Sequence, residues 1–176
     1  MRGIQYLHSK NIIHRDIKSD NILINAKGAV KLADFGYSAQ LTKERDQRES
    51  KVGTSLWMAP ELIKGQRKYG PKVDVWSYGI FAYELTNGDP PYINEKQSRA
   101  IIYICKNDPP KIADKWSALF KDFVSKCLVK DPNERWSADQ LLEHDFLYNA
   151  QEYQEEFSQC VQEFKVIDAE AREKKR

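Results

Sequence analysis

The sequence predicts a mainly α-helical fold with a few short β-strands. After residue 72, several segments carry apolar residues at the three- and four-residue intervals that are typical of helices. The β-prone runs are short and lie in the first 32 residues. The chain has 176 residues, of which 41% are hydrophobic, and this length and composition suit one folded unit with a sizeable core.

The elements are expected in the following order. A short helix is expected around Ile4 and Leu7, because their spacing places both side chains on one helical face. Strands are then expected at Ile12–Ile13, Ile22–Ile24 and Val30–Leu32. The segment Asn25–Gly28 is expected to form the turn between the last two strands. The polar, charge-rich stretch from Asp34 to Glu61 predicts a long surface loop. Helices are expected at Val73–Thr86, Glu95–Lys106, Ser117–Leu128 and Ser137–Glu143.

Charge and cysteine content exclude several classes of protein. The 28 basic and 26 acidic residues give a net charge of +2, too balanced for nucleic acid or a membrane surface to be the main partner. The three cysteines lack the paired spacing of a disulfide framework or a zinc site. No apolar run reaches the roughly 18 residues of a spanning helix. We therefore expect a soluble, cytoplasmic protein without a membrane span.

Three motifs occur in an order that phosphoryl transfer explains well. They are His14-Arg15-Asp16-Ile17-Lys18-Ser19-Asp20-Asn21, then Asp34-Phe35-Gly36, then Ala59-Pro60-Glu61. Each of the two short motifs alone would more often be an ordinary turn, since glycine and proline are common in loops. Their ordered combination supplies a base, a lysine and two oxygen ligands for a metal, which favours a catalytic interpretation.

On these motifs the chain resembles a eukaryotic Ser/Thr protein kinase over residues 1–148. The resemblance covers the large, C-terminal lobe of that fold, with the N-terminal lobe missing, because no Gly-rich loop or strand lysine precedes His14. The domains expected are therefore a partial kinase domain at 1–148 and an amphipathic helical tail at 149–176. The segment Gly53–Glu61 and the pair Ser19-Asp20 are most similar to the sterile-twenty-like kinases, in particular the p21-activated (PAK-like) group.

The resemblance implies a catalytic role for Asp16 and Lys18 and implies ATP and Mg²⁺ as cofactors. Asp16 would accept the proton of the substrate hydroxyl, and Lys18 would offset charge on the transferred phosphoryl group. Lys18 also marks the Ser/Thr class of kinases. Asn21 and Asp34 match the two magnesium ligands and, with Lys18, the nucleotide-binding residues.

Other residues match structural positions of the family. The resemblance gives His14, Phe35 and Gly36 scaffolding roles and pairs Glu61 with Arg135 in a buried ion pair. Asp74 matches an aspartate that accepts backbone N–H groups of the catalytic loop, and an ordinary helix cap explains its spacing equally well.

Control by phosphorylation is also implied. The stretch from Asp34 to Glu61 corresponds to the activation segment of the family. Arg15 matches the arginine that receives a phosphate of this segment, and Ser50 stands where the PAK-like group has its activating threonine. Thr54 matches a threonine near Asp16 and Lys18, for which a structural hydroxyl is the favoured interpretation. An upstream activating kinase and a regulator linked to a small GTPase are the regulatory partners that the resemblance implies.

Substrates are expected to be proteins with Ser or Thr acceptors. Asp20 and Glu84 occupy positions at which relatives with basic sequence preferences place carboxylates against substrate arginines. The competing interpretation, that both are solvated surface acids, is equally weighted.

The tail predicts one apolar helical face, formed by Tyr153, Phe157, Val161 and Phe164. We expect this face to pack on the chain's own lobe, in preference to docking a separate partner. Two functional classes follow: a Ser/Thr kinase of which this chain is a partial catalytic domain, and a noncatalytic kinase-like interaction module or truncated gene product.

Overall fold

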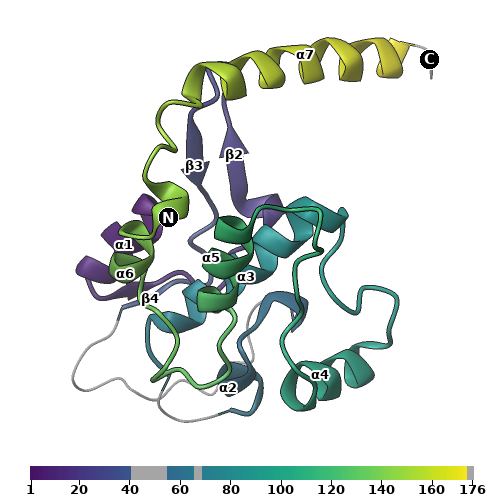
Figure 1. Ribbon diagram of the computed structural model, residues 1–176. Helices are drawn as coiled ribbons and strands as arrows, with labels where there is room; N and C mark the ends of the chain where they lie inside the picture. The colour runs from purple at the N-terminus through teal and green to yellow at the C-terminus, as the bar shows by residue number, and fades with distance from the viewer. Residues whose placement is uncertain (41–54, 66–68, 174–176) are drawn as a thin grey trace.

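The computed structural model describes residues 1–40, 55–65 and 69–173 (Figure 1). It is mainly α-helical with four short strands among these residues, as the sequence predicts. In chain order the elements are α1 Arg2–Ser9, β1 Ile12–Ile13, β2 Ile22–Ile24, β3 Val30–Leu32, β4 Ala39–Gln40, α2 Pro60–Ile63, α3 Lys72–Asn87, α4 Gln97–Lys106, α5 Ala118–Cys127, α6 Ala138–Leu142 and α7 Gln154–Glu173. Short 3-10 turns occupy Ser19–Asn21, Ser55–Trp57 and Asp145–Leu147.

Two small antiparallel sheets hold the loop between β1 and β2. In the β2–β3 hairpin, Ile22 pairs with Leu32 and Ile24 with Val30. In the other sheet, β1 pairs with β4, so that Ile13 lies opposite Ala39. The sequence predicts β1, β2 and β3 but misses β4, and it also misses helix α2 at the end of the expected long loop. Two-residue strands such as β4 carry almost no periodicity, so only their tertiary partner reveals them.

Helix α3 is the centre of the core. Nine of its sixteen residues are buried, as expected of a helix enclosed by other elements. α5 packs closely against it at Gly79, where an added Cβ would lie 2.7 Å from Cδ2 of Leu128. Ile4 and Leu7 of α1 are buried as their spacing predicts. The core therefore fixes the base on which the β1–β2 loop rests.

Helix α7 differs from the prediction in its packing. The helix forms where the tail pattern predicts, but none of its residues is buried. Figure 1 shows α7 leaving the helical body and crossing the tip of the β2–β3 hairpin. There, Gly28 has φ +71° and lies so close to Phe157 and Ser158 that a Cβ would come within 3.2 Å and 3.1 Å of them. The expectation that the apolar face packs on the lobe is therefore wrong beyond this contact.

No helix in the described part of the chain combines the length and the apolar character needed to cross a membrane.

Candidate active site

Asp74, in the first turn of α3, anchors the loop that carries the predicted catalytic residues. Its carboxylate has no exposed surface. Oδ1 accepts the N–H of Arg15 at 2.7 Å, and Oδ2 accepts the N–H of His14 at 2.8 Å and contacts Nε2 of His8 at 2.9 Å. A buried carboxylate is stable when several donors surround it in this way. The predicted contact with the loop is present, and the alternative of an ordinary helix cap is wrong, because no side chain caps α3 among the described residues.

Asp16, Lys18 and Asn21 lie together in this loop. Asp16 is only 4% exposed. The amide nitrogen of Asn21 donates to the backbone oxygen of Asp16 at 2.7 Å and to its Oδ2 at 2.9 Å. Nζ of Lys18 lies 3.5 Å from the same Oδ2 and 3.8 Å from Oδ2 of Asp20. The Asp16 carboxylate is thus held in one orientation beside a positive charge.

His14 connects this loop to the Asp34-Phe35-Gly36 motif. Its Nε2 lies 3.0 Å from the carbonyl oxygen of Ala33, and its Nδ1 accepts the N–H of Asp16 at 3.3 Å. The ring also packs edge-on against Phe35, with ring centroids 5.1 Å apart. A carbonyl can only accept, so these partners assign the proton to Nε2. Both nitrogens serve structural contacts, which agrees with a scaffolding role.

Asp34 follows Ala33, which is hydrogen-bonded to Asn21. The N–H of Ala33 donates to the carbonyl of Asn21 at 2.8 Å and brings the following residue to the loop. Asp34 is exposed, has φ +59°, and accepts the N–H of Gly36 at 3.1 Å. Because the Asn21 nitrogen is engaged by Asp16, its oxygen is the atom left to meet a cation. An amide oxygen and a carboxylate are the hard ligands that Mg²⁺ prefers, so this pair fits the expected ion.

Arg15 is buried and lies at the end of the described part of the activation segment. It has φ +70° and is 6% exposed. Its Nε donates to the carbonyl of Tyr37 at 2.6 Å, and one terminal nitrogen donates to the hydroxyl of Tyr69 at 3.1 Å. The sequence gives no signal for Tyr69. The predicted regulatory residues Ser50 and Thr54 lie outside the described residues.

The structure separates the two acids expected to meet a substrate. The side chain of Asp20 is 75% exposed, as a surface acid would be. Glu84 is buried at 8% exposure. Its carboxylate accepts hydrogen bonds from the Ser19 hydroxyl at 2.5 Å and from Nε1 of Trp57 at 3.0 Å. The interpretation as a solvated surface acid is therefore wrong for Glu84. The sequence misses this bridge from α3 to the catalytic loop, although a buried tryptophan N–H usually needs such a partner.

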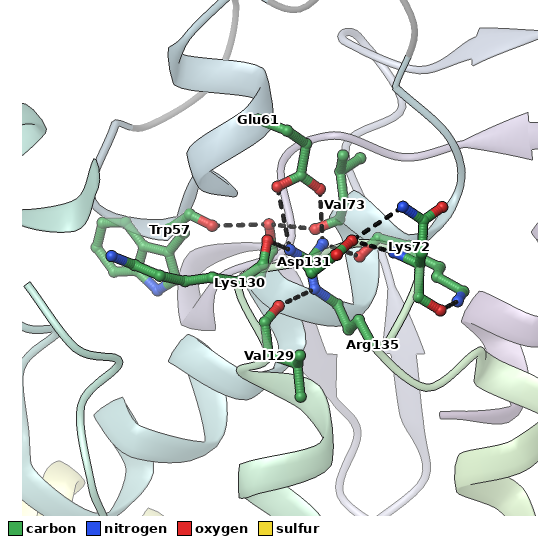
Figure 2. A network of polar contacts seen from close by, with 10 residues as sticks. Trp57, Glu61, Lys72, Val73, Val129, Lys130, Asp131 and Arg135 are labelled. Atoms are coloured by element: carbon green, nitrogen blue, oxygen red, sulfur yellow. Dashed lines mark hydrogen bonds and ion pairs between the residues drawn. The ribbon is translucent and has the colours of Figure 1, made fainter. Parts of the chain in front are cut away.

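The predicted ion pair between Glu61 and Arg135 is present and buried (Figure 2). Two parallel bonds of 2.7 Å and 3.0 Å join the guanidinium to the carboxylate. Arg135 also donates to the carbonyls of Val129 and Lys72 at 2.8 Å each, and its guanidinium lies 5.1 Å from the centroid of the Trp76 ring. This network ties α2, at the end of the activation segment, to the start of α3 and to the loop that follows α5.

Comparison with known proteins agrees with this geometry. Residues 1–147 match the family model described as the protein kinase domain, and the chain belongs to this family.

Among curated proteins, the chain is 50% identical over 149 residues to the serine/threonine-protein kinase PAK 1 of Mus musculus, which covers 84% of this chain and 27% of that protein. It is 52% identical over 149 residues to pak-1 of Caenorhabditis elegans, covering 84% of this chain and 26% of that protein. It is 53% identical over 152 residues to pakB of Dictyostelium discoideum, covering 85% of this chain and 18% of that protein. The chain thus spans about a quarter or less of the length of these relatives.

Proposed function

We propose that this chain is the large lobe of a cytoplasmic Ser/Thr protein kinase that transfers the terminal phosphate of ATP to Ser or Thr hydroxyls of protein substrates. The observation that carries the proposal is the buried Asp16 carboxylate, held by Asn21 and flanked by Lys18. A fixed carboxylate can accept the hydroxyl proton and orient the attacking oxygen, and the adjacent ammonium offsets charge on the transferred group.

Magnesium would be held by the oxygen of Asn21 and the carboxylate of Asp34. When bound, the ion offsets the negative charge of the nucleotide phosphates. The bond from the Ala33 N–H to the Asn21 carbonyl links the two segments that carry these residues, and the Gly36 N–H binds the Asp34 carboxylate.

The division of roles can be tested in a chimera in which the small lobe of mouse PAK 1 precedes residue 1. Asp16→Asn should reduce kcat by at least about a hundredfold with little change in MgATP affinity, because Asp16 positions the acceptor. Asp34→Ala should weaken nucleotide binding itself. Asp114→Asn, at an exposed aspartate that pairs with Lys121, is the matched control and should change neither quantity. Equal loss of MgATP affinity in the Asp16 and Asp34 variants would contradict the proposal.

We also propose regulation by a phosphate on Ser50, added by an upstream activating kinase or through a small-GTPase-linked regulator. A phosphate adds about −1.5 to −2 charges and pairs well with a buried guanidinium such as that of Arg15. Ser50→Ala and Arg15→Ala should each lower the activity of the chimera and should be less than additive, because they remove one contact from opposite sides. Full activity of Ser50→Ala would transfer the role to another hydroxyl, such as that of Thr54.

A preference for basic substrates would depend chiefly on Asp20, which is exposed beside the catalytic loop. Glu84 would have to exchange its contacts with Ser19 and Trp57 before it could hold a substrate arginine. Asp20→Asn should therefore reduce kcat/KM for an arginine-containing peptide more than for a peptide without arginine.

The alternative is a noncatalytic kinase-like interaction module. Residues 1–176 contain no Gly-rich loop to cover nucleotide phosphates, and this observation favours the alternative for the polypeptide by itself. Calorimetry of the 176-residue chain with MgATP tests the alternative in one direction: micromolar affinity would contradict a module without a nucleotide site. Both classes predict weak or no binding for the isolated chain, so phosphoryl transfer by the chimera decides between them.

A further inference from the structure

An exposed apolar stripe runs along α7. Its residues alternate at intervals of four and three, the spacing of a coiled-coil seam: Tyr153, Phe157, Cys160, Phe164, Ile167 and Ala171. Phe164 is 68% exposed and Ile167 is 63% exposed. Large side chains on such a stripe are normally covered by a neighbouring helix.

The rest of the described chain contacts α7 near its beginning. Gln154 donates to the backbone oxygen of Gly28 at 3.3 Å, and Gln162 donates to that of Ala26 at the same hairpin turn. Beyond the hairpin, the second half of the helix extends away from the body of the protein in Figure 1. The hairpin therefore anchors α7 and leaves the Phe164–Ile167 part of the stripe open.

The charges along the stripe decide which kind of helix can cover it. Glu156, Glu163 and Glu170 are spaced seven apart and are exposed, so they form an acidic row along one border. Among the described residues, neither Glu156 nor Glu163 is in an ion pair. The opposite border carries Gln154, Val161 and Asp168, and Asp168 already pairs with Arg172 at 2.9 Å.

A second copy of this chain fits the stripe poorly. In an antiparallel pair, the glutamate row would face the same row of the other copy, and in a parallel pair it would face the border of Gln154, Val161 and Asp168. Neither arrangement supplies positive charge opposite Glu163. A complementary helix needs lysine or arginine along the edge that meets this row.

We propose that α7 is a docking surface for an amphipathic helix of another protein, whose apolar seam is bordered by lysine or arginine. Phe164 and Ile167 insert into the partner's seam, and the row of Glu156, Glu163 and Glu170 sets its orientation. None of the residues proposed for phosphoryl transfer lies on α7.

The test uses the 176-residue chain and two synthetic three-heptad peptides, measured by fluorescence anisotropy at low salt. Both peptides have leucine at the seam; one has lysine and the other glutamate along its borders. The lysine peptide should bind at least about tenfold more tightly than the glutamate peptide. Phe164→Ala should weaken its binding by roughly tenfold, whereas Val166→Ala, which alters an exposed residue on the opposite face, should not.

A charge exchange tests the orientation of the partner. Glu163→Lys should reduce binding of the lysine peptide by several-fold, and the matched variant Glu155→Lys, on the far face of α7, should have little effect. Circular dichroism confirms that each variant is folded. Equal binding of the two peptides, no binding of either, or equal effects of Glu163→Lys and Glu155→Lys would each overturn the proposal. A dimer in sedimentation equilibrium that Phe164→Ala disrupts would also overturn it and assign the stripe to a second copy.

Discussion

The replacement Glu61→Gln should strongly destabilise the protein. Glutamine keeps the size of the side chain and one acceptor oxygen, but it removes the negative charge opposite Arg135, a guanidinium with no exposed surface. Removing one partner of a buried ion pair typically costs about 3–5 kcal/mol, because the other charge stays buried without its counterion.

The geometry gives a similar magnitude. Glu61 accepts two charge-assisted bonds from Arg135, at 2.7 Å and 3.0 Å, and a hydrogen bond to a charged group contributes about 1.5–3 kcal/mol. Both bonds together amount to about 3–6 kcal/mol, and because glutamine keeps one neutral acceptor, the expected loss lies toward the lower end of this range. For a chain of this size, 1 kcal/mol shifts Tm by about 2–4 °C, so a loss of 3–5 kcal/mol lowers Tm by roughly 6–20 °C.

The assay is urea and thermal unfolding of the 176-residue chain, followed by circular dichroism. Glu95→Gln is the matched control, because it breaks a solvent-accessible pair between Glu95, which precedes α4, and Arg99 at 3.3 Å, and it should cost under about 0.5 kcal/mol. The double variant Glu61→Gln/Arg135→Met should recover part of the loss, since it also removes the unpaired charge. If Glu61→Gln proved as mild as Glu95→Gln, the reasoning about the buried pair would be refuted.

Three further predictions concern packing and titration. Gly79→Ala should lower the free energy of unfolding by about 1–3 kcal/mol in urea titration, because its Cβ would lie 2.7 Å from Leu128 and 2.8 Å from Cys127. An unchanged free energy of unfolding would show that α3 and the end of α5 can move apart without cost. Burial raises the pKa of Tyr78 from 10.0 to about 12, so the unfolded chain loses this proton first and stability should fall as the pH rises from about 10 to 12. Tyr78→Phe should reduce that slope in unfolding curves measured across this pH range, and identical slopes would contradict the assignment. Burial also raises the pKa of the Cys127 thiol, so a thiol reagent should label the exposed Cys160 in the native protein and Cys127 only after unfolding; mass spectrometry of the peptides locates the label, and equal native rates would count against the burial of Cys127.

Much of the fold could be predicted because its helices bury a recognisable part of their surface. The periodic segments around α3, α5 and α6 predict these helices to within a few residues, and the run from Ile22 to Leu32 predicts the hairpin. β4 was missed because two residues of strand carry no pattern, and α2 was missed because a single turn is too short to show one. The predicted packing of α7 is wrong only beyond its contact with the hairpin: its spacing predicts an apolar face, but spacing does not say which surface covers it.

The candidate site also has a part that the sequence predicts and a part that it misses. Asp16, Asn21 and Asp34 could be identified because their motifs have fixed spacing in the chain. Contacts that join distant segments through backbone atoms or hydroxyls have no such signature, and so the Tyr69 hydroxyl at Arg15 and the Ser19–Glu84 bond emerge only from the structure. A buried carboxylate such as Glu84 cannot be told from a surface acid by its position in a sequence.

Asp74 binds the loop between β1 and β2 through the backbone N–H groups of residues 14 and 15. Every amino acid except proline supplies this group. This anchor therefore does not depend on which side chains stand at these two positions, although His14 and Arg15 make further contacts of their own. Mutations that abolish the reactive groups would leave this anchor intact, so a lineage could lose its chemistry and retain its architecture. Conversely, a single change at Asp74 would release the loop while every reactive side chain was still encoded.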